Sequence, residues 1–371
     1  MKPRGMMIIH NFRPGPTGGA ELQAERLSKR LVTLGHEMQV LTWLAVPNAL
    51  SEETSDGVRI HRVDHHLPYW VTHDNTATFR YLVKNRGSYD VLHSHMAFGH
   101  SVVAVVAART FGKKCIIKIA CTGEYGDLAA FSTFPGFSKA LVILRQADAV
   151  VAISRMVEKE LISYGWPAER IVRIPNGVDT DYFQRVEPLS EGARTRFVLM
   201  GRRHPQKGID TALRAARKLA DQGLGDKFEI KMYGADYPEH DYRALAHELG
   251  VENLVELLPF EADVLSAYRS AHCLLLPSRG EGMSNSLLEA MAMELAVITT
   301  HVSGTIDVVD DGQDALVVPP DAPDALARRM SDVILNRPLI RELGLRARAK
   351  VMSKFSLGSV ARQYSELYQR L

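Results

Sequence analysis

Glu281 and Glu289 are the two side chains whose type and spacing most suggest chemistry. Seven residues separate them, and the segment 277–292 that contains them is expected to pass from a strand at 273–276 into a helix. Glu281 then precedes the helix and Glu289 lies about two turns along it, so the carboxylates can bind different hydroxyls of one extended ligand. Because this spacing is common by chance, its weight comes from its place between a strand and a helix.

The residues between the two glutamates favour binding of an anion. Gly280 and Gly282 predict a flexible turn, and Ser284 or Asn285 can cap the following helix. The first amides of that helix then point towards whatever lies beyond the strand end, and they carry a partial positive charge.

A cationic loop follows another expected strand, 197–200, and leads into a helix that begins near residue 209. It contains Arg202, Arg203 and Lys207, and loops at this position bind diphosphates in doubly wound domains. The planar fork of an arginine and the point charge of a lysine can together neutralise a diphosphate leaving group. A basic turn that is merely solvated explains this loop equally well when it is taken alone.

A glycine-rich loop at 14–19 follows the first expected strand. Gly18 and Gly19 let backbone amides approach an anion at a helix amino terminus, or they serve only the geometry of a tight turn. The glycine spacing does not match the dinucleotide pattern, and no acidic residue ends the second strand near Trp43. Nicotinamide nucleotides are therefore disfavoured as ligands.

These loops are positioned by a recurring order of strand, loop, helix and strand. That order predicts an α/β fold with two Rossmann-like, doubly wound domains of parallel strands. The pattern breaks into polar residues around 185–196, so we expect an amino-terminal domain over 1–187, a second domain over 188–355, and a C-terminal helix at 356–371 that packs back on the first domain. The expected strands are 6–10, 38–43, 91–93, 115–120 and 149–153 in the first half, and 197–200, 228–233, 254–258, 273–276, 296–299 and 315–318 in the second.

Composition excludes several classes of partner. The 371 residues carry a net charge of only +2 and contain no long basic block, so nucleic acid is not expected. Three cysteines without metal-knuckle spacing favour a reducing compartment, the cytoplasm. The longest apolar run, 102–108, is far shorter than the roughly 20 residues that span a bilayer, so the expected location is cytoplasmic, with peripheral contact at the inner face of the membrane as the alternative. The oligomeric state is not indicated.

Taken together, these motifs resemble those of the family-4 retaining glycosyltransferases, which have the GT-B fold. The resemblance rests on the glutamate pair, on Arg202 with Lys207, on the glycine loop with Glu21, and on the stretch Ile-Pro-Asn-Gly-Val-Asp at 174–179 with Phe183. It covers nearly the whole chain. It implies two Rossmann-like domains whose parallel sheets face each other across a cleft, with Pro175 to Asp179 as a structural marker near the end of the first domain.

The resemblance also implies roles for single residues. The counterparts of Arg202 and Lys207 hold the donor diphosphate. The counterpart of Glu289 holds the ribose hydroxyls, and that of Glu281 contacts the transferred sugar. Glu281, Arg202 and Lys207 are therefore the expected catalytic residues, in an enzyme that needs neither a metal nor a cofactor. The remaining expected donor-binding positions are Gly18, Gly19, Gly282, Met283, Ser284 and Asn285.

The first domain departs from the family at one place. Many relatives carry a histidine after the third or fourth strand, facing the transferred sugar, whereas residues 118–127 contain none. Glu124, Tyr125 and His95 are our acceptor-side candidates. For His93 and His95 a cleft-lining or packing role is favoured over metal binding, because no third ligand accompanies them.

An aromatic loop contains Phe131, Phe134 and Phe137. It could meet an apolar acceptor or a membrane surface, but burial against the next helix is the commoner arrangement.

The expected function is retaining transfer of a hexosyl or N-acetylhexosaminyl unit in polysaccharide biosynthesis. The donor is a nucleotide-diphosphate sugar, with UDP preferred and GDP-mannose next, and the acceptor is a saccharide or a lipid-linked saccharide. The loop 259–262 lies near the expected base site. Two alternatives stay open: an epimerase or hydrolase of the same fold, and a non-catalytic sugar-nucleotide-binding protein, in which Glu281 or Lys207 would be replaced.

Overall fold

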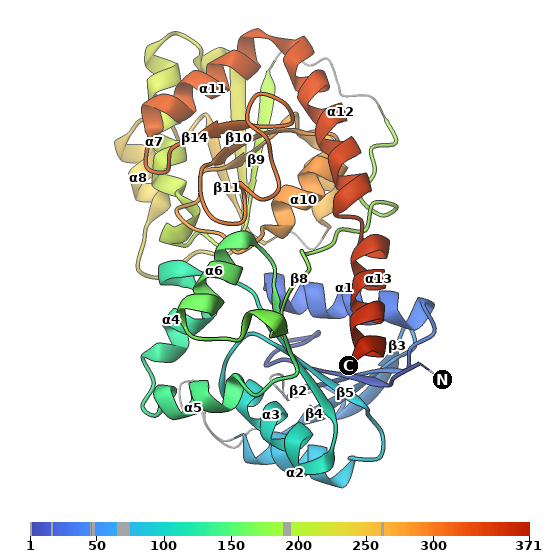
Figure 1. Cartoon of the computed structure of the whole chain (residues 1–371). Helices are drawn as coiled ribbons and strands as arrows, with labels where there is room; N and C mark the ends of the chain where they lie inside the picture. Colours follow the sequence, from blue (N-terminus) through green and yellow to red (C-terminus); the bar gives the residue numbers. More distant parts are fainter. Residues whose placement is uncertain are drawn as a thin grey trace. The chain divides into compact units, whose positions relative to one another are not determined.

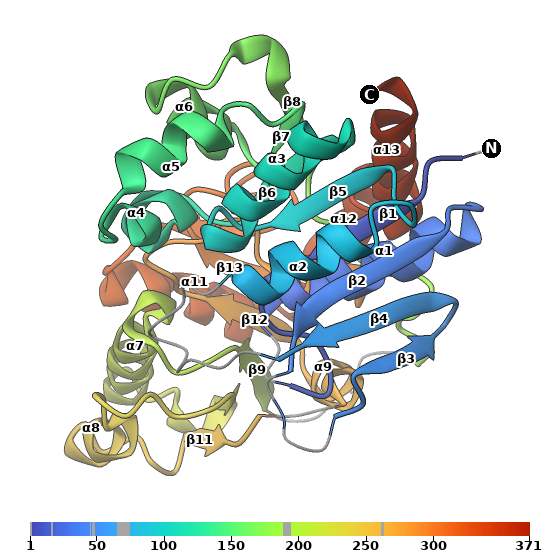
Figure 2. The same cartoon turned by 90° about the horizontal axis from the view of Figure 1, so that it is seen from below.

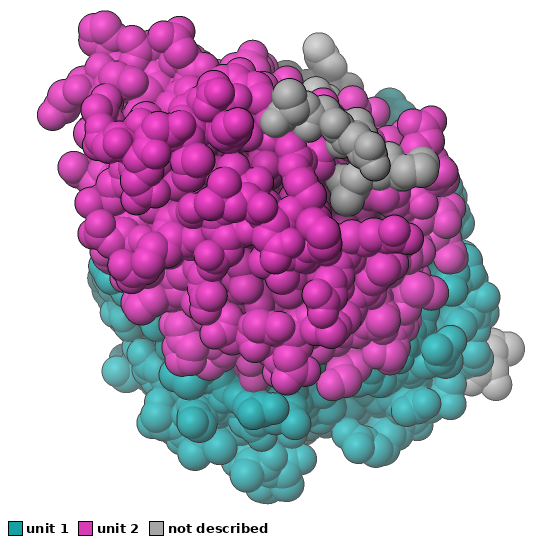
Figure 3. Space-filling view, turned by 90° about the horizontal axis from the view of Figure 1, so that it is seen from above, with its two compact units in different colours: residues 1–177, 357–371 teal, residues 178–356 magenta. Residues whose placement is uncertain are grey.

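The computed structural model describes residues 2–15, 18–44, 46, 49–64, 75–187, 194–260 and 263–371. It divides into unit 1, Met1–Gly177 with Leu357–Leu371, and unit 2, Val178–Ser356, which Figure 3 colours separately. Parts of the glycine-rich loop (16–17), of the expected linker (188–193) and of the loop near the expected base site (261–262) lie outside the described residues.

Unit 1 is built on a sheet with the strand order β3-β4-β2-β1-β5-β6-β7-β8 (Figure 2). All neighbouring strands pair in parallel except β3 and β4, which form an antiparallel hairpin. The strands are β1 (Gly5–Ile8), β2 (Met38–Trp43), β3 (Glu52–Ser55), β4 (Val58–Val63), β5 (Val91–His95), β6 (Lys114–Ile119), β7 (Ala149–Ala152) and β8 (Ile171–Arg173).

Helices cover both faces of this sheet. Helices α1 (Gly19–Thr33) and α13 (Leu357–Arg370) pack together on one face, where Leu27, Met7, Ile116 and Tyr364 belong to one apolar cluster. Helices α2 (Thr76–Lys84) and α3 (Gly99–Phe111) lie on the other face, as Figures 1 and 2 show. The remaining helices of the unit are α4 (Asp127–Ser132), α5 (Phe137–Leu144) and α6 (Arg155–Ser163).

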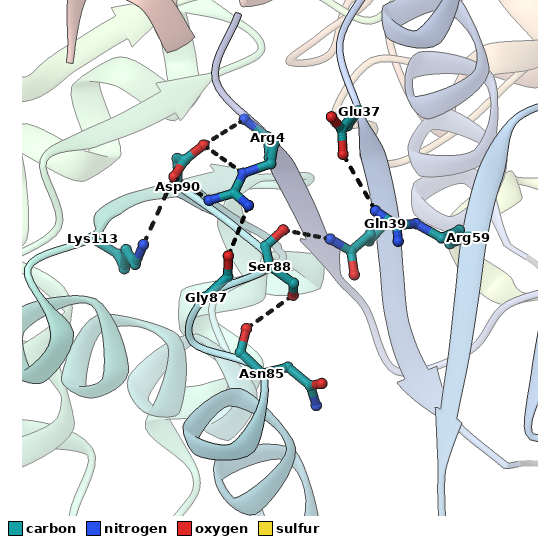
Figure 4. A network of polar contacts seen from close by, with 9 residues as sticks. All are labelled: Arg4, Glu37, Gln39, Arg59, Asn85, Gly87, Ser88, Asp90 and Lys113. Carbon is teal, nitrogen blue, oxygen red and sulfur yellow. Dashed lines mark hydrogen bonds and ion pairs between the residues drawn. The ribbon is translucent and has the colours of Figure 1, made fainter. Parts of the chain in front are cut away.

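A polar network fastens the start of the chain to the segment before β5 (Figure 4). Asp90 accepts hydrogen bonds from the backbone nitrogen and the Nε of Arg4, at 2.9 and 3.0 Å, and Arg4 Nη1 donates to the carbonyl of Gly87 at 2.7 Å. The hydrogen bond from Arg4 lowers the pKa of Asp90 to about 2. Because this network lies at the amino ends of β1 and β5, we assign it to stability and not to a ligand site.

Unit 2 contains a parallel sheet with the order β11-β10-β9-β12-β13-β14. Its strands are β9 (Thr195–Met200), β10 (Phe228–Tyr233), β11 (Val255–Leu258), β12 (Cys273–Leu276), β13 (Ala296–Thr300) and β14 (Leu316–Val318). Helices α7 (Ile209–Asp221), α8 (Tyr242–Glu248) and α11 (Pro323–Leu335) share one apolar cluster with the sheet. The unit is completed by α9 (Val264–Ser270), α10 (Asn285–Ala292) and α12 (Arg337–Lys354).

The chain crosses between the units at places that differ from the expected boundary at 187. Residues 178–187 belong to unit 2 because their backbone and side chains bond there: Arg185 donates to the carbonyls of Met293 and Ala271, at 3.0 and 3.3 Å, and Arg348 donates to the carbonyl of Phe183 at 3.1 Å.

The C-terminal helix α13 belongs to unit 1. His36 Nε2 and Ser365 Oγ lie 2.8 Å apart, and His93 Nδ1 lies 2.9 Å from the hydroxyl of Tyr368. Among the described residues, no helix has the length and apolar character needed to cross a membrane.

Candidate donor site in unit 2 and acceptor-side candidates in unit 1

The loops that carry the expected donor residues leave neighbouring strands at the point where the strand order of unit 2 reverses. Successive strands run outward from β9 to β10 and β11 on one side, and from β12 to β13 and β14 on the other. The loops 201–208 and 277–284 follow the carboxyl ends of β9 and β12, which pair in parallel. Ligands of doubly wound sheets bind in the crevice at this kind of reversal.

Lys207 and Glu281 meet at this reversal of the strand order. Lys207 Nζ donates to Glu281 Oε1 at 2.6 Å, and the hydroxyl of Ser278 donates to the same oxygen at 2.7 Å. Glu281 and Ser278 are buried, so this oxygen is fixed by two donors in a setting of low water access. Oε2 of Glu281 accepts no hydrogen bond from the described residues and is therefore available to a hydroxyl of a ligand.

The two loops are also joined through their backbones. The amide of Arg279 donates to the carbonyl of Gln206 at 2.7 Å, and the side-chain amide of Gln206 donates to the carbonyl of Gly280 at 2.9 Å. Gly208 has a φ of 63°, and a Cβ added to it would lie 2.0 Å from the carbonyl oxygen of Pro277. Only glycine permits this close approach, so the cationic loop and the glycine turn form one structural piece.

The cationic loop separates its charges into different environments. Arg203 is buried, pairs with Asp236 at 2.7 Å and donates to the carbonyl of Leu258 at 2.6 Å, so it holds strand ends together. Arg202 is exposed, and no hydrogen bond or ion pair joins its guanidinium to the described residues. Of the two arginines, therefore, only Arg202 is placed to bind a ligand.

Glu289 lies within α10, the helix that follows the turn of Gly280 and Gly282. Ser284 caps this helix, since its hydroxyl accepts from the amide of Leu287, which settles the choice between Ser284 and Asn285 as the cap. Glu289 is buried, and the hydroxyl of Tyr268 on α9 donates to its Oε2 at 3.0 Å. The carboxylates of Glu281 and Glu289 are thus held by different partners from different elements.

In unit 1, the start of α1 already holds a negative charge. Glu21 is buried, and its Oε2 accepts from the amide of Gly18 at 2.9 Å. A phosphate at this amide would meet that carboxylate, so the anion-cradle interpretation of the glycine-rich loop loses support, while Gly18 and Gly19 can still approach an uncharged part of a ligand.

His95 lies inside unit 1 and does not fit the acceptor-side role that we expected for it. Its ring stacks on His93, with centroids 4.7 Å apart, and burial lowers its pKa well below the ordinary value. The packing alternative therefore describes both histidines. Glu124 is exposed and Tyr125 half-buried in the 3-10 turn Gly123–Tyr125, so these two acceptor-side candidates remain predictions.

The aromatic loop of unit 1 is mainly a packing feature. Phe131 is buried, and the ring centroids of Phe134 and Phe137 lie 6.2 and 5.5 Å from its own. Burial against the neighbouring helix, the commoner of the two arrangements considered, therefore accounts for Phe131, whereas Phe134 and Phe137 are half-buried.

Sequence reasoning missed several residues of these sites. The Ser-x-x-Glu spacing of Ser278 and Glu281 is a local signal that could have found the first. No local signal indicates Tyr268, which comes from another helix. In unit 1, His100 Nδ1 lies 2.7 Å from His10 Nε2 at the carboxyl ends of β5 and β1, where the strand order of that unit reverses.

Comparison with known proteins gives two matches to family descriptions. Residues 17–182 match Glycosyltransferase Family 4, and residues 194–336 match Glycosyl transferases group 1. The first match contains Gly18, Gly19 and the stretch 174–179, and the second contains the cationic loop and the glutamate pair.

Individual proteins resemble the chain over most of its length. The D-inositol 3-phosphate glycosyltransferase of Acidothermus cellulolyticus is 28% identical, over 88% of this chain and 81% of that protein. A protein of Salmonella typhimurium named for colanic acid biosynthesis, the glycosyltransferase WcaL, is 28% identical over 62% of this chain, and the match spans 58% of that relative's length.

Among solved structures, that of Anabaena Alr3699/HepE in complex with UDP-glucose has a TM-score of 0.81 with 18% identity, covering 100% of both chains. At this identity the likeness establishes the fold. Together with the two family matches and the geometry of unit 2, it leads to one assignment: the chain belongs to the family-4 glycosyltransferases of the GT-B fold.

Proposed function

We propose that the protein transfers a hexosyl or N-acetylhexosaminyl unit from a nucleotide-diphosphate sugar to a saccharide or lipid-linked saccharide, with retention of configuration. The observation that carries this proposal is the meeting of Lys207 and Glu281 at the strand reversal of unit 2, beside the exposed Arg202. A carboxylate with one oxygen available suits a sugar hydroxyl, and the adjacent cations suit a diphosphate.

The proposed division of labour assigns one part of the donor to each group. Arg202 and Lys207 bind the diphosphate, Glu281 binds the transferred sugar through Oε2, and Glu289 binds the ribose. Lys207 uses one of its three N–H donors on Glu281, so two remain for phosphate oxygens without loss of the ion pair. The amides near Met283 and Ser284, at the start of α10, add a partial positive charge on the same side.

In the transfer step, the bond between the anomeric carbon and the diphosphate oxygen breaks while a bond from the acceptor oxygen to that carbon forms. The acceptor proton passes to the leaving diphosphate, so no protein general base is assigned. Negative charge grows on the diphosphate as the bond breaks, and fixed cations stabilise that charge more than they stabilise the bound substrate. We expect this chemistry to need no metal.

UDP is the preferred nucleotide. The structural likeness to Alr3699/HepE, which was solved with UDP-glucose, supports this choice, and GDP comes next. The Salmonella typhimurium relative named for colanic acid biosynthesis supports a polysaccharide pathway. We place the protein in the cytoplasm, where its three free cysteines stay reduced, and a lipid-linked acceptor would bring it to the inner face of the membrane.

The test begins with thermal-shift measurements on UDP, GDP and ADP and on their common sugars. A donor present at about 100 times its Kd stabilises the native state by about 2.7 kcal/mol, so the matching nucleotide raises the melting temperature while the others leave it unchanged. Failure of every nucleotide sugar to bind would refute the proposal.

The donor found in this way is then incubated with the protein, with candidate acceptors and with EDTA. Transfer that continues in EDTA, with the anomeric configuration of the product read by NMR, supports a metal-independent retaining enzyme, and an inverted product would contradict retention. Incubation without acceptor separates the other enzymes of this fold, because an epimerase or hydrolase would release an epimer or free sugar.

Glu281→Gln, which keeps the size of the side chain but removes its charge, should lower the transfer rate by at least about 10²-fold if Glu281 acts on the transition state.

A further inference from the structure

Arg279 makes four contacts that together connect three segments around the donor site. Its Nη2 pairs with Asp210 at 2.8 Å, and its Nε pairs with Asp321 at 2.7 Å. Its Nη1 donates to the carbonyl of Pro205 at 2.5 Å, and its amide donates to the carbonyl of Gln206. Asp210 lies in the first turn of α7, and Asp321 lies between β14 and α11.

The position of Arg279 in the chain gives these contacts a consequence for the ligand. Arg279 follows Ser278 and lies two residues before Glu281, and the carbonyl of Pro205 that it binds lies two residues before Lys207. The guanidinium therefore joins the loop that carries the carboxylate to the loop that carries the ammonium. A planar fork with several donors can hold such an arrangement, which a single point charge cannot.

Charge balance argues against a direct role for Arg279 on the diphosphate. Two carboxylates face its single positive charge, and the hydrogen bond to Asp210 is the main cause that raises the pKa of Arg279. Burial is the largest single influence on Asp210 and acts to raise its pKa, yet the hydrogen bond and the charge of Arg279, together with backbone amides, lower the pKa overall. The cluster therefore carries no excess positive charge that would attract a phosphate, in contrast to Arg202.

We infer that Arg279 is a positioning residue, which with Asp210 and Asp321 fixes the loop of Lys207 against the loop of Glu281 before the donor binds. This inference rests on the proposed function, since it assigns to Arg279 the pre-organisation of that donor site. Groups held in place before binding lose less conformational freedom on binding. Arg279 thus supports affinity and rate through Lys207 and Glu281, without contacting the substrate.

The experiment compares Arg279→Ala, Arg279→Lys and a matched control, Arg217→Ala, by UDP binding in calorimetry and by donor kinetics. Arg217 pairs with Asp221 on the exposed side of α7, so its loss removes an arginine ion pair of the same unit away from the site. We expect Arg279→Ala to lower kcat/KM by about 10- to 100-fold, as misplacements of about 1 Å do in other enzymes, and Arg217→Ala to leave it unchanged. Arg279→Lys should recover only part of the loss, because a lysine cannot keep both ion pairs and the bond to Pro205.

A double-mutant cycle separates positioning from general destabilisation. If Arg279 acts through Lys207, then Lys207→Gln combined with Arg279→Ala should weaken UDP binding by much less than the product of the two single effects. Asp321→Asn, on an exposed loop residue, provides a second and milder variant that removes one ion pair and should show the same coupling.

The outcomes distinguish the inference from the proposed function. Wild-type protein that binds no nucleotide sugar would overturn both. Two results would overturn the positioning role alone, given a wild-type protein that binds UDP. One is a double variant in which the two single effects on UDP binding multiply, and the other is an Arg279→Ala variant as active as the wild type. Coupled effects at an unchanged melting temperature support it.

Discussion

Replacing Lys118 with methionine should make unit 1 more stable, although the change removes a charged side chain. Lys118 lies on β6 and is only 3% exposed, and its ammonium forms no hydrogen bond or ion pair with the described residues. Its ammonium lies 5.8 Å from the centre of the Tyr364 ring, and its neighbours include His93 and His95. Burial of a charge without a carboxylate partner is expensive, and methionine fills a similar volume without that penalty.

The size of the effect follows from proton affinity. Burial lowers the pKa of Lys118 from 10.5 to about 7. At 1.36 kcal/mol for each tenfold change in proton affinity, the buried charge costs about 5 kcal/mol at acidic pH and about 4 kcal/mol at pH 7. Between pH 7 and 10.5 the unfolded chain keeps the proton that the native state has lost, so native stability rises with pH, and the penalty falls to about 1 kcal/mol at pH 10.

Neighbouring groups do not obscure this pH window. Burial lowers the pKa of His93 to about 3 and that of His95 well below its ordinary value, so both histidines are neutral above pH 7 in the native state. Burial raises the pKa of Tyr364 well above 10, so its hydroxyl stays protonated there.

The assay is urea unfolding at pH 7, 8.5 and 10, followed by tryptophan fluorescence. All three tryptophans belong to residues 1–177, so their signal reports on unit 1 even if the units unfold separately. Lys114→Met is the matched control, because Lys114 is on the same strand but exposed, and it should change stability by no more than about 0.5 kcal/mol. A Lys118→Met protein that is less stable at pH 7, or whose advantage persists undiminished at pH 10, would refute the reasoning.

Three further predictions concern single contacts. Tyr268→Phe removes the hydroxyl that donates a hydrogen bond to Glu289 and should weaken UDP binding by about 1 kcal/mol in calorimetry. An unchanged Kd for UDP would show that Glu289 does not bind the nucleotide sugar. Gly208→Ala combines a φ of 63° with a clash against a backbone carbonyl, so it should lower the free energy of unfolding of unit 2 by more than about 1 kcal/mol in urea unfolding. An alanine variant as stable as the wild type would contradict this. Asp90→Asn should lower the free energy of unfolding by about 1 kcal/mol at pH 7, a value reduced for solvent screening because the Asp90 side chain is 40% exposed. The pKa of Asp90 in the native state is about 2, below the ordinary 3.8, so the carboxylate stabilises the native state fully above pH 3.8. The difference in stability from wild type should therefore vanish as the pH falls through 2.

Much of the fold could be predicted because parallel strands buried on both faces appear as short apolar runs. The bounds of β2, β10 and β12 agree with the expected ranges, and the order of elements in both halves is confirmed by the two doubly wound sheets. The hairpin of β3 and β4 was missed, although its turn, Asp56–Gly57, is a strong local signal with φ angles of 50° and 78°. β3 alternates exposed and half-buried residues, and β4 alternates buried residues with exposed or half-buried ones, so both lack the continuous apolar run that revealed the others.

The arrangement of the donor site could be predicted only in part, because the fate of a charged side chain depends on partners distant in sequence. Arg202 and Arg203 are adjacent, yet Arg203 is buried by Asp236 and by the end of β11, more than thirty residues away. Likewise, nothing local indicates that Lys207 binds Glu281 across 74 residues. Motif spacing predicted which loops form the donor site, and the structure joins these two loops through hydrogen bonds, whereas tertiary contacts decide which of their atoms stay available to a ligand.

The ion pairs of unit 2 also explain how so many cations can gather without repelling one another. Lys207 is balanced by Glu281, and Arg203 by Asp236, while Arg279 lies between two carboxylates. Within the two described loops this leaves Arg202 as the cation without a carboxylate partner, so in the proposed function an incoming diphosphate would meet one uncompensated charge and one ammonium that is already oriented. In the proposed transfer, the leaving diphosphate gains charge only as the glycosyl bond breaks. Cations that carboxylates already hold in place would then stabilise this charge more strongly without moving, which is electrostatic pre-organisation.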